Sequence, residues 1–363
     1  MTDKKLLLDF PPYPPEAYAG LADRLKSVLR TQNDVLFVQG EAIIALEATA
    51  ASLAGSTIHA LNIVTSPYGR WFGEWLRRGG AVVADLEAKA GLPIKADAVA
   101  QALKAWPSTN LVAMVHAESA SGILNPLPEI ARLARANGAL LVVDAVASVG
   151  GHELDVDALG VDIAVIGPQK ALGGPSGISA LSISRRAWQI IDRHDAPVQS
   201  VLSLMDLKRN WLDIGRGVLP GMPSALEFHA LEAALDKVDE EGVDVLIARH
   251  ALAARATRSG LRALGASLWI EPDKDASNLV TAVRVHEDIS SATILRHPDS
   301  VAAGLDEAVG AIAGRVIRLN HTGPRARREI VRANVLAFGQ ALRAARLPAD
   351  LDAAEAAIAQ TYR

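Results

Sequence analysis

Short apolar runs that end on charged residues place the strongest constraint on how this chain folds. Ala139–Val143 is followed by Asp144, and Asp162–Ile166 is followed by a Gly-Pro-Gln sequence and Lys170. Runs of this length and composition are typical of strands buried on both faces of a parallel sheet. Because ligands bind at the carboxyl edge of such sheets, the sequence predicts that Asp144 and Lys170 lie together at a binding site.

The same alternation of strand, turn and helix continues along the first half of the chain. Strands are predicted at 36–38, 59–64 and 111–115, and helices at 41–53, 68–78 and 126–135. Strands that alternate with helices indicate an α/β fold with a doubly wound, mainly parallel sheet.

The pattern changes after Arg193. Residues 194–224 contain three prolines and predict an irregular connector. Beyond it we expect a helical region at 225–264, strands at 280–285 and 316–319, and a helix at 327–346. The chain is therefore expected to form a large α/β domain over 1–224, with a short N-terminal arm over 1–20, and a smaller α+β domain over 225–363.

Composition excludes several classes of protein. With 363 residues, half of them hydrophobic, the chain is long enough for two domains. It has no cysteine, which excludes disulfides and thiolate metal sites, and its nine histidines show no metal-binding spacing. A net charge of -4 gives no reason to expect a nucleic-acid partner. Because no apolar stretch is long enough for a membrane span or a secretion signal, a cytoplasmic protein that acts on small molecules is expected.

A carboxylate and an amine at neighbouring strand ends suit one kind of cofactor. The aspartate would keep a pyridine nitrogen protonated, and the lysine would form a Schiff base with an aldehyde, as pyridoxal chemistry requires. A lysine after a strand is more often a surface charge, however, and an aspartate there is more often a helix cap. Asp144 and Lys170 alone leave both interpretations open.

Six segments, in order and with similar spacing over residues 36–330, carry a resemblance to one family. They are Gly40-Glu41-Ala42 with Ala45–Ala48, Tyr68-Gly69, His116–Gly122, Val143–Ser148, Gly167–Leu172 and Arg318–Gly323. The chain resembles the class V, fold-type-I aminotransferases of the alanine-glyoxylate and serine-pyruvate group. Members of that family act on amino and keto acids and assemble with shared active sites, so the resemblance implies a homodimer or homotetramer. The cysteine desulfurases, which are relatives, need a thiol that this chain lacks.

The resemblance also implies a role for each matching residue. Lys170 would form the Schiff base, Asp144 would hold the ring nitrogen, and Arg318 would bind the substrate carboxylate. The cofactor would also be bound by Val146 and Tyr68 on its two faces, by the hydroxyl of Ser119 at its phenolic oxygen, and by Gln169 near its phosphate end. Without the resemblance, Tyr68 and Ser119 would be interpreted as ordinary loop residues. Trp71 and Trp75 are predicted to be core or interface residues.

Two positions depart from most of the family. Glu41 stands at the start of a helix, where relatives leave exposed N–H groups for a phosphate, and Pro168 replaces a phosphate-binding serine. A carboxylate about 4 Å from a phosphate costs on the order of 4 kcal/mol near a protein surface. One member of the family that shares both departures uses unphosphorylated pyridoxamine as a substrate. A glutamate at this position can also be a simple helix cap.

These departures imply a transaminase that transfers the amino group of pyridoxamine to pyruvate, giving pyridoxal and L-alanine, with Glu41 binding the free hydroxymethyl group. Two alternatives stay open. One is an alanine- or serine-glyoxylate aminotransferase that uses pyridoxal 5'-phosphate, and the other is a catalytically silent homologue that only binds pyridoxal. The segment 302–313 lacks the second arginine expected before Arg318, and Leu8 and Phe10 stand where a tyrosine is expected. These differences bear on the identity of the substrate.

Overall fold

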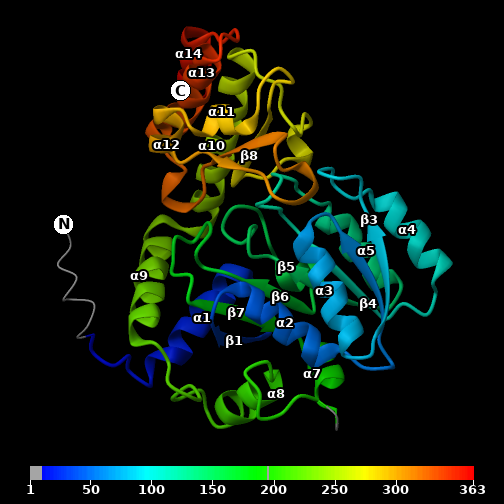
Figure 1. Cartoon of the computed structure of the whole chain (residues 1–363). Coiled ribbons are helices and arrows are strands. Elements are labelled where there is room, and N and C mark those ends of the chain that lie inside the picture. Colours follow the sequence, from blue (N-terminus) through cyan, green and yellow to red (C-terminus); the bar gives the residue numbers. More distant parts are fainter. Residues whose placement is uncertain (1–9, 194–195) are drawn as a thin grey trace.

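The computed structural model describes residues 10–193 and 196–363. The first nine residues of the expected N-terminal arm, with Leu8 and the leucine run at 6–8, lie outside the described residues. Figure 1 shows a larger part built around one sheet and a smaller part, above it in that view, that contains the C-terminus.

The larger part is organised around a sheet of seven described strands in the order β1-β7-β6-β5-β4-β2-β3. Their bounds are β1 Asp34–Gln39, β2 His59–Val64, β3 Val82–Glu87, β4 Leu111–Val115, β5 Leu140–Asp144, β6 Ile163–Ile166 and β7 Ile178–Ile183. Only β7 runs antiparallel to its neighbours β1 and β6. The β2-β3, β2-β4, β4-β5 and β5-β6 pairs are parallel. The predicted doubly wound, mainly parallel sheet is confirmed.

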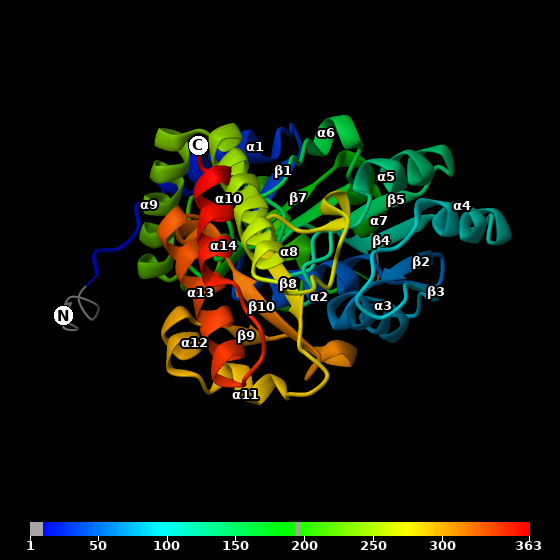
Figure 2. The same ribbon diagram turned by 90° about the horizontal axis from the view of Figure 1, so that it is seen from above.

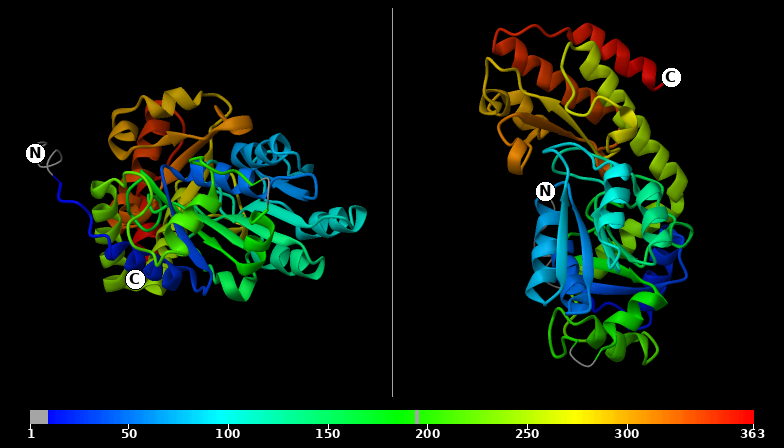
Figure 3. Two further views of the ribbon diagram at one scale, coloured as in Figure 1. Left: turned by 90° about the horizontal axis from the view of Figure 1, so that it is seen from below. Right: turned by 90° about the vertical axis from the view of Figure 1, so that its right-hand side faces the viewer.

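The central strands are buried because helices cover both faces of the sheet. Every residue of β4, β6 and β7 is buried, and in β5 only Asp144, the last residue, is partly exposed. In the right-hand view of Figure 3, the blue helix α3 and the cyan helices α4 and α5 lie on opposite sides of the strands. The helices of this part are α1 Ala17–Leu29, α2 Ala42–Leu53, α3 Pro67–Arg78, α4 Ala96–Ala105, α5 Leu127–Ala136, α6 Val156–Leu159 and α7 Arg185–Ile191.

The connector predicted to be irregular contains short helical turns. α8 spans Leu204–Leu207, and a π-helical turn follows at Lys208–Leu212. The indole of Trp211 in this turn is fully buried, and its ring lies 5.9 Å from that of Phe37 on β1. The connector is therefore anchored to the core of the larger part.

The smaller part contains a three-stranded antiparallel sheet in the order β8-β10-β9 within the described chain. Its elements are β8 Val280–Arg284, β9 Asp306–Glu307, β10 Val316–Asn320, α10 Val243–Ala263, α11 Ser291–Leu295, α12 Pro298–Ala303, α13 Arg328–Ala344 and α14 Leu351–Thr361. α10 and α14 lie side by side (Figure 2) and form a second hydrophobic core with α13 and the sheet. The predicted smaller α+β part is present.

Two helices occupy the region predicted as one helical stretch. α9, Ala225–Glu241, ends at Gly242, whose φ of 83° is a conformation that L residues rarely adopt, and α10 begins directly after it. Phe228, Leu231 and Leu235 of α9 pack into the core of the larger sheet. A domain boundary at 224/225 stays a prediction.

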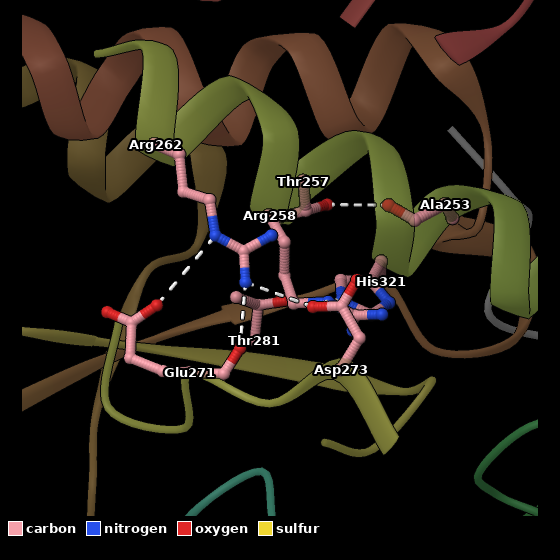
Figure 4. A network of polar contacts seen from close by, with 8 residues as sticks. All are labelled: Ala253, Thr257, Arg258, Arg262, Glu271, Asp273, Thr281 and His321. Carbon is pink, nitrogen blue, oxygen red and sulfur yellow. Dashed lines mark hydrogen bonds and ion pairs between the residues drawn. The ribbon is translucent and has the colours of Figure 1, made fainter. Parts of the chain in front are cut away.

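A polar network attaches α10 to the segment 271–273, which precedes β8 (Figure 4). Arg258 is 4% exposed and donates from Nε to Asp273 Oδ1 at 3.0 Å, and Arg262 donates to the same oxygen at 3.0 Å. Close by, Thr281 Oγ1 on β8 and His321 Nε2 beyond β10 lie 2.9 Å apart. Because a buried charge needs partners, the contact with Asp273 holds the Arg258 side chain and α10 against the segment that precedes β8.

Among the described residues, none of the helices combines the length and the apolar character that crossing a membrane would require.

Candidate active site

A cavity of about 280 Å³ lies at the carboxyl edge of β4 and β5. Six of the predicted site residues line it: Glu41, Tyr68, Ser119, Asp144, Val146 and Lys170. The other two, Gln169 and Arg318, are not lining residues, but each is hydrogen-bonded to a residue that is. The fold therefore gathers into one place residues that are up to 277 positions apart in the sequence.

Asp144 is the last residue of β5, between Val115 on β4 and Val165 on β6. The backbone N–H of Val146 donates to Asp144 Oδ1 at 3.0 Å, which fixes the carboxyl group at the cavity wall. Burial raises the pKa of Asp144 to about 6, against the lowering effects of the Val146 hydrogen bond and of Lys170. A cationic partner in the cavity would favour its ionised form.

Lys170 lies four residues beyond the end of β6 and is partly buried. Burial lowers the pKa of its amine, Arg318 lowers it further, and the carboxylates of Glu41 and Asp144 raise it. A lysine whose pKa is lowered by burial supplies more neutral amine at neutral pH than an exposed one.

Glu41 is the N-cap residue of α2 and holds the first turn of that helix. Its Oε2 accepts from the backbone N–H of Ile43 at 2.9 Å, and its Oε1 accepts from Gln169 Nε2 at 2.9 Å. Gly40 before it has a φ of 146°, and a Cβ there would lie 2.5 Å from Ile44 Cδ1. Glycine is therefore needed for the chain to enter α2 in this direction. A negative side chain occupies the positive end of the helix.

Tyr68 is the second residue of α3, and its position is set by the start of that helix. Ser66 is the N-cap and accepts from the backbone N–H of Tyr68 at 3.3 Å, with Pro67 at the first helical position. Trp71 lies one turn later and also lines the cavity, with its ring edge-on to that of Tyr68 at 5.5 Å. Trp71 is 39% exposed, so it is not a core residue, and the alternative predicted from sequence, an interface residue, stays a prediction.

Arg318 reaches from β10 of the smaller part to the loop that carries Ser119. Its Nη1 donates to the carbonyl oxygen of Ser119 at 2.9 Å, and its Nε donates to the carbonyl oxygen of Glu307 at 2.9 Å. Nη2 lies 4.0 Å from Asp306 Oδ2. Two backbone carbonyls thus orient the guanidinium group and leave Nη2 with a single, distant carboxylate. The described structure gives no hydrogen bond for the Ser119 hydroxyl.

Glu118 is a cavity residue that sequence reasoning did not assign. It is 1% exposed and lines the same cavity, and burial raises its pKa to about 7. The sequence offered one signal, a glutamate inside the His116–Gly122 segment, but it did not indicate that the side chain is buried.

The donor set fits a ring with a basic nitrogen and an aldehyde, and it does not fit a metal. The cavity is lined by the partly buried carboxyl group of Asp144 and amine of Lys170, by the aromatic ring of Tyr68 and by the branched side chain of Val146. Within the described residues, histidine, aspartate and glutamate side chains form no cluster that could hold a metal ion.

The fold and this arrangement define a class of enzyme. Residues 16–313 match the family model of class V aminotransferases, and the chain belongs to that family, whose members depend on forms of vitamin B6.

Particular relatives are similar over almost the whole chain. Pyridoxamine–pyruvate transaminase from Mesorhizobium japonicum is 35% identical over 345 residues, covering 94% of this chain and 87% of the relative. The crystal structure of pyridoxamine-pyruvate aminotransferase from Mesorhizobium loti superposes with a TM-score of 0.90 at 32% identity, over 96% of this chain and 89% of the other. Ureidoglycine-glyoxylate aminotransferase from Bacillus subtilis gives a TM-score of 0.88 at 25% identity, over 99% and 95%. The resemblance found in the sequence is confirmed.

Proposed function

We propose that this aminotransferase transfers the amino group of unphosphorylated pyridoxamine to pyruvate, giving pyridoxal and L-alanine. The observation that carries the proposal is the Glu41 carboxylate, which accepts the α2 N–H group that would otherwise be offered to a phosphate. The similarity to pyridoxamine–pyruvate transaminase supports it.

The residues around the cavity divide the chemistry among them. When bound, the pyridine ring of vitamin B6 supplies an electron sink for the carbon that gains or loses the amino group. Asp144 holds a proton on the ring nitrogen, and its own pKa falls when that cation is present. Lys170, whose pKa burial lowers, offers a neutral amine as nucleophile to the aldehyde and moves the proton at the substrate carbon.

The walls of the cavity position the ring. Tyr68, Val146 and Ser119 all line the cavity. Tyr68 and Val146 would lie against the two faces of the ring, and the Ser119 hydroxyl would bind its phenolic oxygen. Arg318 binds the carboxylate of pyruvate or alanine through the fork of its guanidinium group, which the Ser119 and Glu307 carbonyls already hold in one orientation.

Glu41 and Gln169 determine which form of the vitamin binds. The carboxylate of Glu41 accepts a hydrogen bond from a free 5'-hydroxymethyl group and repels a phosphate dianion. Charges about 4 Å apart repel by on the order of 4 kcal/mol near a protein surface. Gln169 donates to Glu41 and keeps the carboxylate on the cavity side of the helix end.

The test is to incubate the apoprotein with pyridoxamine and, in separate reactions, pyruvate, glyoxylate or 2-oxoglutarate. We expect pyridoxal and L-alanine to appear in equal amounts with pyruvate. Formation of no pyridoxal with any keto acid would contradict the proposal.

A second candidate, a glyoxylate-using aminotransferase with bound pyridoxal 5'-phosphate, is favoured by one observation. Glu41 is exposed, so its side chain can rotate away and free the N–H groups of α2 for a phosphate. The likeness to ureidoglycine-glyoxylate aminotransferase supports this candidate too. Phosphorus analysis of the freshly purified protein separates the two, because only the second retains a stoichiometric phosphate.

We also propose that the protein is at least a dimer. The connector after the π-helical turn exposes Ile214, Val218 and Met222, which are 70%, 57% and 94% exposed. Several large apolar side chains exposed within one surface segment favour a subunit interface. Size-exclusion chromatography with light scattering tests this, and a monomer at micromolar concentration would contradict it.

A further inference from the structure

The Glu118 carboxyl group is buried at the cavity and has no part in the chemistry described above. Its Oε1 accepts a hydrogen bond from the Thr65 hydroxyl at 2.5 Å, and its Oε2 has no hydrogen-bonding partner among the described residues. Burying a carboxyl group with one oxygen unpaired is costly, so a side chain of this kind calls for an explanation.

Glu118 is one end of a chain of hydrogen bonds that runs beneath the cavity. Asn125 Nδ2 donates to Thr65 Oγ1 at 3.0 Å and to the carbonyl oxygen of Val115 at 2.8 Å. Asn125 Oδ1 accepts from the backbone N–H of Ile94 at 3.0 Å. The Thr65 hydroxyl therefore accepts from a fixed amide and has its own proton available for Glu118.

This series of hydrogen bonds joins the two sides of the cavity that would hold the ring. Thr65 directly precedes Ser66, the N-cap that accepts from the backbone N–H of Tyr68. Glu118 directly precedes Ser119, whose carbonyl oxygen accepts from Arg318. The Thr65–Glu118 hydrogen bond is thus a side-chain link between the turn that carries Tyr68 and the loop that carries Ser119 and anchors Arg318.

We propose that Glu118 is a positioning residue which, through Thr65, holds Tyr68 and Ser119 at the separation that a pyridine ring requires. The inference rests on the proposed function only in assigning the cavity to the vitamin B6 ring. It applies equally to the free and the phosphorylated vitamin, because the ring is the same in both.

The test is the dissociation constant of the apoprotein for pyridoxal and for pyridoxal 5'-phosphate, followed by visible absorbance. We expect Glu118→Ala and Thr65→Val each to weaken the binding of both ligands by about tenfold, which corresponds to one hydrogen bond. The double variant should bind no more weakly than Glu118→Ala alone, because both changes remove one interaction. Glu118→Gln should restore most of the affinity, since its amide oxygen can accept from Thr65.

Asp162 provides a matched control. It is also a buried acid, 4% exposed, but it precedes β6 at the amino edge of the sheet, where it accepts from Ser184 and from the backbone of Leu141. Asp162→Asn should leave both dissociation constants within about twofold of wild type, a change below half a hydrogen bond. Should Glu118→Ala not fold, the pair Thr65→Val and Thr65→Ser carries the test, because only the serine keeps the hydroxyl.

Two results would overturn the inference: wild-type affinity in a folded Glu118→Ala variant, or additive losses in the double variant. The proposed function is judged separately, by which ligand binds more tightly. A wild type that prefers the phosphorylated form, together with losses for both ligands in Glu118→Ala, would contradict the proposed function and support this inference.

Discussion

At the scale of single residues, the position of a side chain at the end of its element governs what it can do. Asp144 is placed by the end of β5, Tyr68 by the capped start of α3, and Glu41 by the start of α2. Glu41 combines two effects, since it caps the helix and fills the helix end with negative charge. A substitution of Glu41 therefore tests the selectivity for the form of the vitamin separately from the rest of the chemistry.

Glu41→Ala is expected to reduce the preference for pyridoxamine over pyridoxamine 5'-phosphate, measured as the ratio of their kcat/KM values, by at least about tenfold. Removing the carboxylate removes the repulsion of the phosphate and frees the N–H groups of α2. Glu47→Ala, on the same helix but outside the cavity lining, is the control and should keep the wild-type ratio. An unchanged ratio in Glu41→Ala would exclude Glu41 as the determinant of selectivity.

The sequence predicted the site residues that lie at the ends of clear apolar or helical patterns. It did not predict those whose positions depend on tertiary contacts. Asp144 and Lys170 follow apolar runs, and Glu41 opens a helix, so their neighbourhood could be predicted. The cavity position of Trp71 and the burial of Glu118 depend on how α3 and the loop after β4 pack, which no local pattern encodes.

At the scale of elements, α3 packs closely on β2, and this approach places the cavity wall. A Cβ at Gly73 would lie 2.4 Å from Asn62 Nδ2 and 2.9 Å from Asp85 Oδ1. Asn62 donates to Asp85 and to the carbonyl oxygen of Gly69, so the polar pair between β2 and β3 also holds the helix.

Gly73→Ala is expected to displace α3 and to lower the free energy of unfolding by about 1–3 kcal/mol, as overpacking of a core does. Because α3 carries Tyr68 and Trp71, pyridoxal binding should weaken as well. Gly20→Ala in α1 is the control, since nothing lies within 4 Å of its Cβ, and it should raise the free energy of unfolding by up to about 1 kcal/mol. Denaturant titration measures the free energy of unfolding of both variants. Equal effects of the two substitutions would contradict the close packing of α3 on β2.

Five of the seven strands of the larger sheet could be predicted, and the two exceptions have physical reasons. The helices α1, α4, α6 and α7 were not predicted. β3 is an edge strand in which most residues are only partly buried, and Asp85 and Glu87 limit its apolar run to Ala81–Ala84. β7 is fully buried, but its serines, Ser179 and Ser182, interrupt the apolar pattern. The end of α9 at Gly242 could not be predicted, because a single glycine within a long helical pattern does not by itself indicate a break.

At the scale of the whole molecule, buried neutral histidines lie where the two parts meet. Burial lowers the pKa of His321 to about 3 and the pKa values of His250 and His116 to about 4. His250 Nε2 accepts from the backbone N–H of Gly323, and its Nδ1 lies 2.8 Å from the carbonyl oxygen of Leu246. The junction is therefore built for uncharged imidazoles.

Stability should fall as the pH decreases from about 6.5, where an unfolded histidine begins to bind a proton that the folded protein excludes. For His321 this continues to a pH of about 3, with a slope of up to about 1.4 kcal/mol per pH unit. The gap in unfolding free energy between wild type and His321→Gln should therefore narrow from pH 7 to pH 5. Burial raises the pKa values of Asp144 and Glu118, so these two carboxyl groups increase stability as the pH falls. Their contribution is the same in wild type and in His321→Gln, and it therefore cancels in the gap between them.

The measurement is chemical unfolding at pH 7, 6 and 5, with His286→Gln as the control because His286 is about half exposed. A gap for His321→Gln that stays constant with pH would show that the buried imidazole is already charged in the folded protein.

The most direct test of the central claim is the ratio of the kcat/KM values of the wild-type enzyme for pyridoxamine and pyridoxamine 5'-phosphate, with pyruvate as the common acceptor. The position of the Glu41 carboxylate at the α2 helix end predicts that pyridoxamine is preferred by at least about a hundredfold. Equal values, or a preference for the phosphorylated form, would contradict it.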